Sequence, residues 1–273
     1  MAKSKLKYPA SQYPGGGWAK DLHGNEKGWK RFRQTLNRVC PKTVSQYEQV
    51  VDCFGPIRNQ GNRRTSTAFA CLSVIEYFEH RVRGCLCERS KEFLYSITSS
   101  TIHRNKRCQD CTIRDTLRAL SRFGAPPEIY WEYSPIGRKP KPKDPRLFSF
   151  AGDFLDLRYA KLDSADADGN ATLKRVKKCL RLGIPIVFGY EVHWLSTPKT
   201  PFPISSPFYT PGWQSVVACG FDDEIASVLI RNSCGTEWGQ GGYAWLPYAY
   251  IHDDHAADFW VVWKDEWMNR IYR

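Results

Sequence analysis

The stretch Gln60-Gly-Asn-Arg-Arg-Thr-Ser-Thr-Ala-Phe-Ala-Cys71 decides how the rest of the chain is interpreted. Its first half is polar and contains a glycine, as in a tight turn, whereas its second half is apolar, as in a buried helix. Ser66 stands where this helix begins, beside unpaired backbone N–H groups and the positive end of the helix dipole. The position suits an ordinary N-cap, a role that Thr65 fills equally well, or a nucleophile held at a helix start.

Length and composition exclude several classes of protein. The chain has 273 residues, enough for one large domain or two small ones around a hydrophobic core. Hydrophobic residues make up 42% and aromatic residues 14%, which excludes a disordered chain. The basic N-terminus lacks the apolar segment of a signal peptide, and no apolar run approaches the ~18 residues of a membrane span. The sequence therefore predicts a cytoplasmic protein without a membrane partner.

The chain is strongly basic, with a formal net charge of +12. Such a charge favours acidic partners, such as nucleic acid or an acidic protein surface. The 40 basic residues are dispersed along the chain, however, so that solubility together with a basic tail is the simpler explanation. The local candidate for an electrostatic contact is the proline-rich stretch 137–146, which we expect to form a surface loop.

Ten cysteines are present, and a cytoplasmic location argues against disulfides. Their one cluster joins Cys85 and Cys87 with Cys108 and Cys111. The second pair has the spacing of a zinc hook, but the first is one residue too tight. Free buried thiols are the simpler interpretation. We therefore expect no metal or cofactor and keep the four cysteines as a weak metal-site candidate.

Hydrophobic periodicity divides the chain into a helical half followed by a strand half. Residues 1–41 are basic and turn-rich, and we expect an arm that lies over the core or is partly disordered. Helices are expected over residues 66–80, from about 90 through 97, 112–123 and 172–182. Strands are expected over residues 184–194, 215–221, 227–231, 243–246 and 259–263. This order predicts an α+β fold with its binding site in a cleft between the two halves.

Three segments resemble a known family. Residues 60–69 are similar to the pattern Gln-Gly-x-x-Gly-(Ser/Thr)-Cys-x-Ala-Phe around the nucleophile of papain-like cysteine peptidases, especially their bacterial branch. The stretch Gln-Ser-Val-Val-Ala-Cys-Gly-Phe-Asp-Asp, residues 214–223, resembles the family's strand that bears the catalytic histidine. Asn-Ser-Cys-Gly-Thr-Glu-Trp-Gly, residues 232–239, resembles its Asn-Ser-Trp-Gly-x-x-Trp-Gly segment. The resemblance spans about residues 45 to 265, and its motifs follow the family's order.

The resemblance implies a two-lobed papain-like domain from residue 42 to residue 273. The helical lobe is expected over about residues 42–135. The second lobe, an antiparallel β-sheet or barrel, is expected over about residues 150–265. The cleft between the lobes is where the family holds its substrate.

The family's catalytic positions correspond to Ser66 for the nucleophile and Gln214 for the base. Asn232 matches the residue that orients the base, and Gln60 matches the oxyanion-hole residue. A serine hydroxyl needs a base to take its proton, and a glutamine amide is not basic near neutral pH. The sequence therefore predicts a hydrogen-bonded chain of Ser66, Gln214 and Asn232 side chains in place of a working triad.

The expected cleft wall also departs from the family. Arg64 replaces a glycine beside the catalytic position, and Cys111 replaces the last glycine of a Gly-Gly pair. We expect Arg64 to close the cleft with a salt bridge, or else to receive an acidic group of a ligand. The predicted cleft-binding residues are Arg64, Thr65, Cys111, Trp213 and Trp238.

The favoured function is that of a pseudoenzyme, a degenerate peptidase homologue that binds or scaffolds a peptide or protein. The aromatic segment 259–267, Phe-Trp-Val-Val-Trp-Lys-Asp-Glu-Trp, suggests a partner surface, although its apolar part also fits a core strand. One alternative is a weak or unconventional peptidase or acyl transferase that uses Ser66 or a relocated base such as His193. A second alternative is a basic nucleic-acid-binding module on the same fold.

Overall fold

The computed structural model describes residues 26–39, 51–102, 110–137, 141–142, 144–163, 167–192 and 212–272. The predicted α+β fold is confirmed: a helical half precedes a strand half along the chain. The helical half contains α3 (Ser66–Arg83), α4 (Lys91–Ile97), a π-helical turn (Thr98–Ile102) and α5 (Ile113–Phe123). Three short 3₁₀ turns follow, at Glu128–Tyr130, Pro145–Phe148 and Ala151–Phe154.

Capping residues mark the C-terminus of α3 and the N-termini of α4 and α5. Gly84 closes α3 in the left-handed conformation, with φ of 72°, and its N–H donates to His80 O. Ser90 caps α4 by accepting from Phe93 N–H, and Thr112 caps α5 by accepting from Asp115 N–H. These caps explain why the sequence predicted the ends of α3, α4 and α5 to within a few residues.

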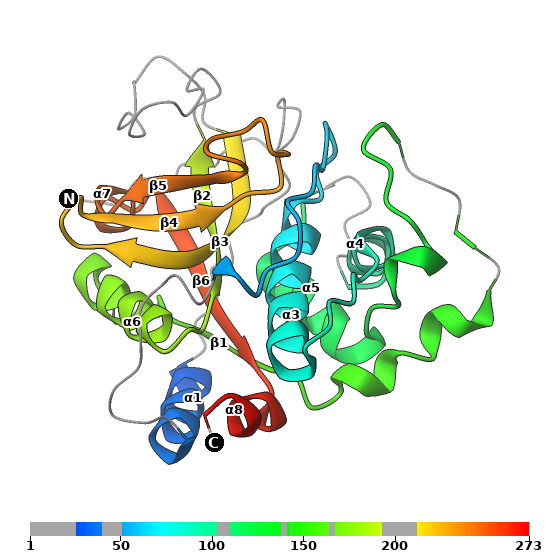
Figure 1. The fold of residues 1–273 in the computed structure, drawn as a ribbon, viewed down its shortest axis with the longest axis horizontal. Helices are drawn as coiled ribbons and strands as arrows, with labels where there is room; N and C mark the ends of the chain where they lie inside the picture. The colour runs from blue at the N-terminus through cyan, green and yellow to red at the C-terminus, as the bar shows by residue number, and fades with distance from the viewer. Residues whose placement is uncertain are drawn as a thin grey trace, which may run out of the picture.

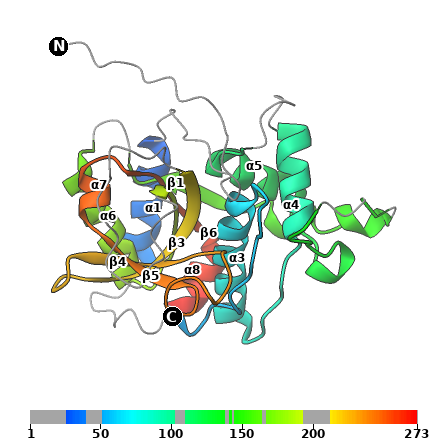
Figure 2. The same cartoon turned by 90° about the horizontal axis from the view of Figure 1, so that it is seen from above.

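The strand half forms one six-stranded antiparallel sheet in the order β1-β6-β2-β3-β4-β5. Its strands are β1 (Arg158–Lys161), β2 (Ile186–Val192), β3 (Gly212–Asp222), β4 (Ser227–Arg231), β5 (Tyr243–Pro247) and β6 (Ala256–Trp263). Helix α6 (Gly169–Arg181) packs on β2 and β3 (Figure 1), and the short α7 (Ala249–His252) lies beside α6 (Figure 2). From above, α3 lies between the sheet and α4, so α3 forms the junction of the two lobes (Figure 2).

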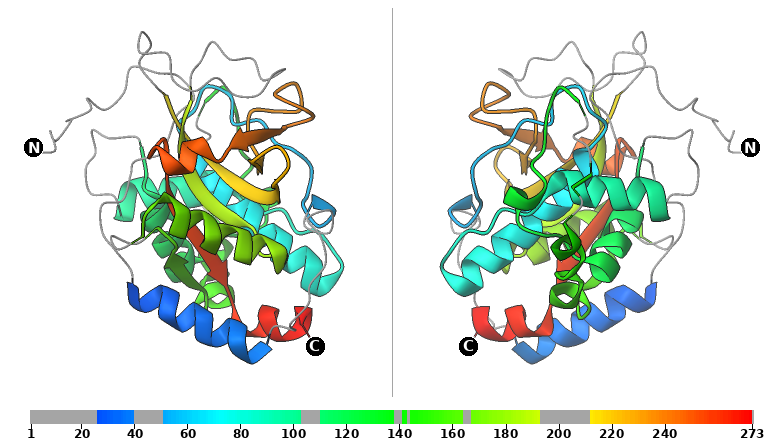
Figure 3. Two further views of the ribbon diagram at one scale, coloured as in Figure 1. Left: turned by 90° about the vertical axis from the view of Figure 1, so that its left-hand side faces the viewer. Right: turned by 90° about the vertical axis from the view of Figure 1, so that its right-hand side faces the viewer.

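Helix α1 (Glu26–Val39) corrects the expectation of a loose arm over part of residues 1–41. Phe32 and Leu36 on this helix are buried against the core, and α1 packs on β1 and on α8 (Asp265–Ile271). Figure 3 shows α1 and α8 next to each other along one edge of the molecule. The sequence did not predict this helix because basic residues and nearby glycines interrupt its apolar stripe of Trp29, Phe32, Leu36 and Val39.

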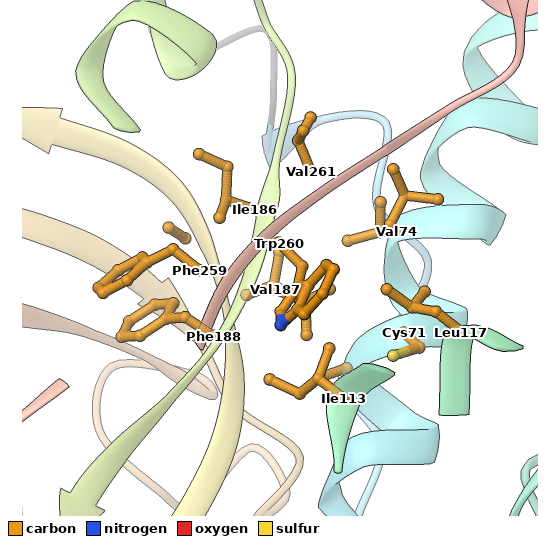
Figure 4. Close-up of a cluster of buried hydrophobic side chains, with 14 of the residues drawn as sticks. Cys71, Val74, Ile113, Leu117, Ile186, Val187, Phe188, Phe259, Trp260 and Val261 are labelled. Carbon is orange, nitrogen blue, oxygen red and sulfur yellow. The ribbon is translucent and has the colours of Figure 1, made fainter. Parts of the chain in front are cut away.

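The core joins both lobes. Cys71 and Val74 of α3 and Leu117 of α5 face the sheet, and Trp260 of β6 lies between these helices and the strands (Figure 4). Farther from the helices, Phe188 and Phe259 stack at 4.7 Å with an interplanar angle of 8°. Apolar burial across the junction fixes the two lobes against each other and thereby positions the start of α3.

The apolar part of the aromatic segment 259–267 is a core strand, the second of the two interpretations left open by the sequence, and does not form a partner surface. Phe259, Trp260, Trp263 and Trp267 are all buried. Trp267 of α8 stacks on Phe78 of α3, with ring centroids 5.2 Å apart. In the part of the chain that the structure describes, no helix has the length and apolar character needed to cross a membrane.

Candidate functional site

A tight turn leads into α3 and is held from both lobes. Gly61 has a φ of 59°, and a Cβ at this position would lie 2.5 Å from the Pro135 carbonyl oxygen, so the turn requires glycine. The Asn59 side chain accepts from Gly61 N–H at 2.8 Å, and Gln60 N–H donates to the Ser233 carbonyl of the strand lobe at 2.8 Å. The turn is therefore fixed on both sides of the lobe junction.

Ser66 is the first residue of α3 and is completely buried, with 0% of its surface exposed. Its Oγ accepts a hydrogen bond from the Ser215 backbone N–H at 3.2 Å. Thr65 occupies the N-cap position, but its hydroxyl bonds to the Tyr133 hydroxyl at 2.7 Å and does not cap the helix. Ser66 thus bonds across the junction to the strand lobe, whereas Thr65 bonds within the helical lobe.

Gln214 occupies the centre of a neutral polar network and is 3% exposed. Its Nε2 donates to Gln60 Oε1 at 2.9 Å and to Asn232 Oδ1 at 3.0 Å. Ser233 completes the network, because its hydroxyl donates to Gln60 Oε1 at 2.6 Å and its N–H donates to Asn232 Oδ1 at 2.8 Å. We call Gln60, Gln214, Asn232 and Ser233 the amide network.

The structure brings the four predicted catalytic positions together, but half of the predicted hydrogen-bond chain differs. The link from Gln214 to Asn232 forms as expected. Ser66 Oγ bonds to the backbone of Ser215 and not to the Gln214 side chain. The Gln214 amide nitrogen donates instead to the side-chain oxygens of Gln60 and Asn232, and these two bonds use both of its hydrogens.

The oxyanion-hole candidate is also engaged within the chain. Gln60 Nε2 donates one of its two hydrogens to the Arg63 carbonyl at 2.9 Å, so part of its donor capacity is used inside the turn. The Gln60 backbone carbonyl accepts from the Tyr133 hydroxyl at 2.8 Å. Burial raises the pKa of Tyr133, which keeps this phenol in its protonated, donating form.

The two arginines of the turn have carboxylate partners. Arg64 Nη1 lies 3.0 Å from Asp110 Oδ2, which is the salt bridge expected for this position. Arg63 forms a bidentate salt bridge with buried Glu92, Nη1 to Oε2 at 2.5 Å and Nη2 to Oε1 at 2.9 Å. Its Nη1 also donates to the Ser134 carbonyl at 2.8 Å. These pairs tie the turn to the helical lobe and neutralise both guanidinium charges locally.

The remaining predicted cleft residues differ in exposure. Thr65 and Cys111 are buried. Arg64, Trp213 and Trp238, which we call the rim, are half-buried on the chain segments that carry Gln60, Gln214 and Asn232. Cys234 lies beside the amide network, where Gln214 Nε2 approaches its Sγ at 3.9 Å. Burial raises the pKa of Cys234 to about 11, so this thiol is protonated near neutral pH and is not an activated nucleophile.

The cysteine cluster is only partly within the described residues. Cys85 is exposed, Cys87 is half-buried and Cys111 is buried, while Cys108 lies outside the described part of the chain. Among the residues that are described, no three His, Cys, Asp or Glu side chains are grouped to hold a metal ion.

Sequence reasoning missed three residues that define the site. Ser233 bonds to both amide partners, and only its position next to Asn232 hinted at this. Asp110 pairs with Arg64, and its position next to Cys111 was a usable signal. Tyr133 bonds to Thr65 and to Gln60 from a loop that carries no motif, so no signal in the sequence pointed to it.

Comparison with known proteins supports the motif-based expectation. No protein-family model matches the chain. An uncharacterized peptidase C1-like protein of Acanthamoeba polyphaga mimivirus is 30% identical over 158 residues, which cover 55% of this chain and 50% of that relative. The chain therefore spans only about half the length of this curated relative.

Solved structures match over more of the chain. Xylellain, a cysteine protease from Xylella fastidiosa, has a TM-score of 0.70 at 25% identity, covering 95% of this chain and 98% of its own. Digestive procathepsin L 3 of Tenebrio molitor larval midgut has a TM-score of 0.57 at 15% identity, covering 86% and 78%. The proform of the ragweed pollen cysteine protease Amb a 11 has a TM-score of 0.58 at 18% identity, covering 81% and 65%. These matches confirm the two-lobed fold that the motifs predicted.

Proposed function

Starting from a chain that is a homologue of the papain-like cysteine peptidases, we propose that it is a pseudoenzyme that binds a peptide or protein segment without cleaving it. One observation carries the proposal. The position expected to hold the base is Gln214, a neutral amide whose nitrogen donates to Gln60 and Asn232, beside a serine that is fully buried.

Hydrolysis by this arrangement lacks a proton acceptor. A serine attacks a carbonyl only when a base removes its proton, and an amide nitrogen that donates two hydrogen bonds has no proton-accepting lone pair to offer. Loss of the nucleophile or the base in a hydrolytic triad costs on the order of a millionfold in rate. Ser66, whose Oγ accepts a hydrogen bond from the Ser215 backbone, is held as a structural group.

The described histidines do not replace the missing base. His80 lies fourteen residues after Ser66 on α3, which separates them by about 21 Å along the helix axis. His255 bonds to Glu191 at 2.7 Å, and the strand partner of Glu191 is Trp213, whose side chain points to the opposite face of β3 from that of Gln214. His252 is an exposed residue at the end of α7. His193, the relocated base considered from the sequence, lies outside the described residues. The peptidase alternative therefore gains no support from the site.

The rim supports binding of a peptide segment. Trp213, Trp238 and Arg64 are half-buried on the segments that carry the amide network, and they combine aromatic surface with a fixed guanidinium. Half-buried tryptophan and arginine side chains are the residue types that dominate energetics at protein interfaces. The Arg64–Asp110 pair presents this rim in one geometry, which lowers the entropy cost of binding.

The test restores the two catalytic side chains. Ser66→Cys together with Gln214→His places a thiol at the start of α3 and an imidazole within reach of Asn232. We expect the natural chain to leave a broad peptide library intact, whereas the double variant cleaves it, with cleavage read by mass spectrometry. Ser66→Cys and Gln214→His alone are the matched controls, and both should be silent. A Cys234→Ala background ensures that any thiol chemistry comes from residue 66.

Each outcome decides a different part of the proposal. Cleavage by the natural chain would overturn the pseudoenzyme assignment. Silence of the natural chain with cleavage by the double variant supports a cleft that still holds peptides. Silence of a folded double variant, even after Arg64→Gly opens the wall, contradicts peptide binding in this cleft.

A further inference from the structure

A polar groove of about 540 Å³ lies between α1, β1 and α8. Its lining is made of polar and charged residues and includes three arginines and one carboxylate: Arg31, Gln34, Thr35, Arg38, Arg158 and Asp265. We call this feature the arginine groove. It brings together residues from three segments that are far apart in the sequence but adjacent in space (Figure 3).

The arginine groove holds more positive charge than its own acid neutralises. Asp265 Oδ2 lies 2.8 Å from Arg158 Nη1 and 3.7 Å from Arg38 Nη2. These two arginine side chains are nevertheless 42% and 60% exposed, so their guanidinium groups face solvent beside the carboxylate. Arg31 is exposed and forms no ion pair with any described residue. The site thus offers guanidinium donors that an anion can reach.

Helix α1 extends the positive charge beyond the groove. Lys27, Arg31, Gln34 and Arg38 recur every three or four residues and share one face of α1. From first to last they span about 16 Å along the helix axis. The buried Phe32 lies on the other side of the helix, so the charged face points away from the core.

We propose that the arginine groove binds the phosphate backbone of a nucleic acid without reading its bases. Phosphate oxygens are bound in proteins by arginine and lysine together with hydroxyl and amide side chains. Arg31, Arg38 and Arg158, with Thr35 and Gln34, supply that set of donors. The groove lining contains no aromatic ring on which a base can stack, which is why base recognition is not part of the proposal.

The residues that line the groove also favour nucleic acid over two other acidic partners, a protein surface and an anionic membrane. A protein interface is anchored by apolar and aromatic side chains at its centre, and a membrane surface is entered by an apolar helix face. The apolar face of α1 is buried in the core, and the groove lining offers no apolar side chain. The exposed large hydrophobic residues of the described chain lie elsewhere, at Leu86, Ile129, Ile136, Phe148, Leu155 and Ile225.

The arginine groove is separate from the amide network. Helix α8, which forms one wall of the groove, packs on α3 at Phe78. Phe78 is twelve residues after Ser66, a separation of about 18 Å along α3. The inference therefore stands independently of whether the cleft binds peptides.

The experiment measures binding of fluorescein-labelled 20-base-pair duplex DNA and of a 20-nucleotide RNA by fluorescence anisotropy across a salt series. The groove variant is Arg31→Gln with Arg38→Gln and Arg158→Gln. The matched control removes the same charge from exposed cations of α5 and α6, by Arg118→Gln, Lys174→Gln and Lys178→Gln. We expect the groove variant to lose at least tenfold in affinity near 100 mM salt and the control to lose less than threefold.

The salt dependence gives a second readout. Each phosphate contact contributes about 0.9 to the slope of log affinity against log salt on duplex DNA, so the groove variant should lower the slope by about 2 to 3. Equal losses of affinity in the groove variant and the control would show that only the overall positive charge attracts the nucleic acid, which would contradict a site at the groove. Failure of the natural chain to bind, or tighter binding to polyglutamate or to phosphatidylserine vesicles, overturns it as well.

Folding of the groove variant is checked by circular dichroism and thermal melting. Removing Arg38 and Arg158 leaves Asp265 without its described partners, which can destabilise the edge of the fold. The second variant, Lys27→Gln with Arg31→Gln, breaks no ion pair among the described residues. We expect it to lose at least threefold in affinity at unchanged melting temperature, and an unchanged affinity contradicts the proposal.

Discussion

Two buried polar networks of opposite character lie against helix α3. Beside its first turn, the amide network and Ser66 contain no charged group. About three to four turns later, Glu76 and Glu79 on the helix bind Lys91 and Arg89, and all four are buried. Neutral groups need only hydrogen bonds when buried, whereas charges need paired partners as well. The comparison shows that this fold tolerates buried charge, but the amide network itself contains only neutral groups.

The ionic network ties α3 to the segment that follows it. Arg89 bonds to Glu79 through Nη2 and Nε, at 2.5 and 2.9 Å, and its Nη1 donates to the Ala125 carbonyl at 3.0 Å. Lys91 Nζ lies 2.9 Å from Glu76 Oε1. Because all of these donors are satisfied, the desolvation cost of the charges is offset, and removal of one partner exposes that cost.

The largest effect is therefore expected from Arg89→Met. This change leaves Glu79 buried without its main partner and should lower the free energy of unfolding by about 3 to 5 kcal/mol, measured by urea denaturation. The matched double variant Arg89→Met with Glu79→Met removes both charges and should recover a large part of the loss. A double variant that is less stable than Arg89→Met would contradict this explanation, in which the cost comes from burying the Glu79 charge without its partner.

The neutral counterpart is Gln214→Leu. Here Asn232 Oδ1 and Gln60 Oε1 each keep a hydrogen bond from Ser233, so the carbonyl groups stay satisfied. The free energy of unfolding should fall by about 1 to 2 kcal/mol, less than for Arg89→Met. Ser66→Ala is the matched comparison: it leaves the buried Ser215 N–H without its acceptor and should cost about 1 to 3 kcal/mol. A loss from Gln214→Leu as large as that from Arg89→Met would erase the distinction between the two networks.

Sequence reasoning located the elements whose ends have chemical markers. Gly84, Ser90 and Thr112 mark helix ends by their conformation or their side chains, and the strand 227–231 was predicted to the residue. In α1, Trp29, Phe32, Leu36 and Val39 do have helical spacing, but the basic residues between them led to the prediction of an arm. Strand β1 has four residues and no turn signal, so periodicity cannot identify it.

The candidate site was predictable in its members but not in its bonds. Motif order assigned Gln60, Ser66, Gln214 and Asn232, and the structure brings all four together. The direction of the Ser66 bond depends on the register of β3 against α3, a tertiary property that no local pattern encodes. Burial of the aromatic segment 259–267 likewise depends on which elements cover it, because a core strand and an exposed patch have the same composition.

A third polar cluster, at the edge strand β1, combines features of the two networks and makes a pH prediction. Asp163 accepts from the N–H groups of Asp258 and Phe259 at 2.8 Å, and Lys161 lies 2.7 Å from Asp258 Oδ1. Burial raises the pKa of Asp163 to about 6, with the Asp258 charge adding to the rise, while Lys161 and the two N–H groups oppose it.

The sign of the effect follows from the two pKa values. In the unfolded chain the pKa of an aspartate is about 3.9, so between about pH 4 and pH 6 the folded state binds more protons. The contribution of Asp163 to the free energy of unfolding is therefore fully present below pH 4 and is lost as the pH rises through 6. Because the Asp163 side chain is 18% exposed and so partly solvated, we expect the free energy of unfolding to fall by about 2 kcal/mol or less over this pH range.

The variant Asp163→Asn isolates this effect. It keeps one acceptor oxygen and cannot titrate, so the stability of the natural chain relative to the variant should be higher at pH 4.5 than at pH 7. Urea denaturation at both pH values gives the difference. A relative stability that stays constant, or that rises with pH, contradicts the assignment of a raised pKa to Asp163.

The smallest effect concerns reactivity and returns to the amide network. The thiolate is the reactive form of cysteine, and burial raises the pKa of Cys234 to about 11, whereas Cys85 is exposed. Iodoacetamide at pH 7.5 should therefore label Cys85 at least tenfold faster than Cys234, measured by peptide mass spectrometry. Gln214 Nε2 approaches Cys234 Sγ at 3.9 Å, so Gln214→His places an imidazole beside this thiol and should speed its labelling. Equal rates in the natural chain would mean that an activated thiol already lies in the site, and the neutral character assigned to the amide network would be wrong.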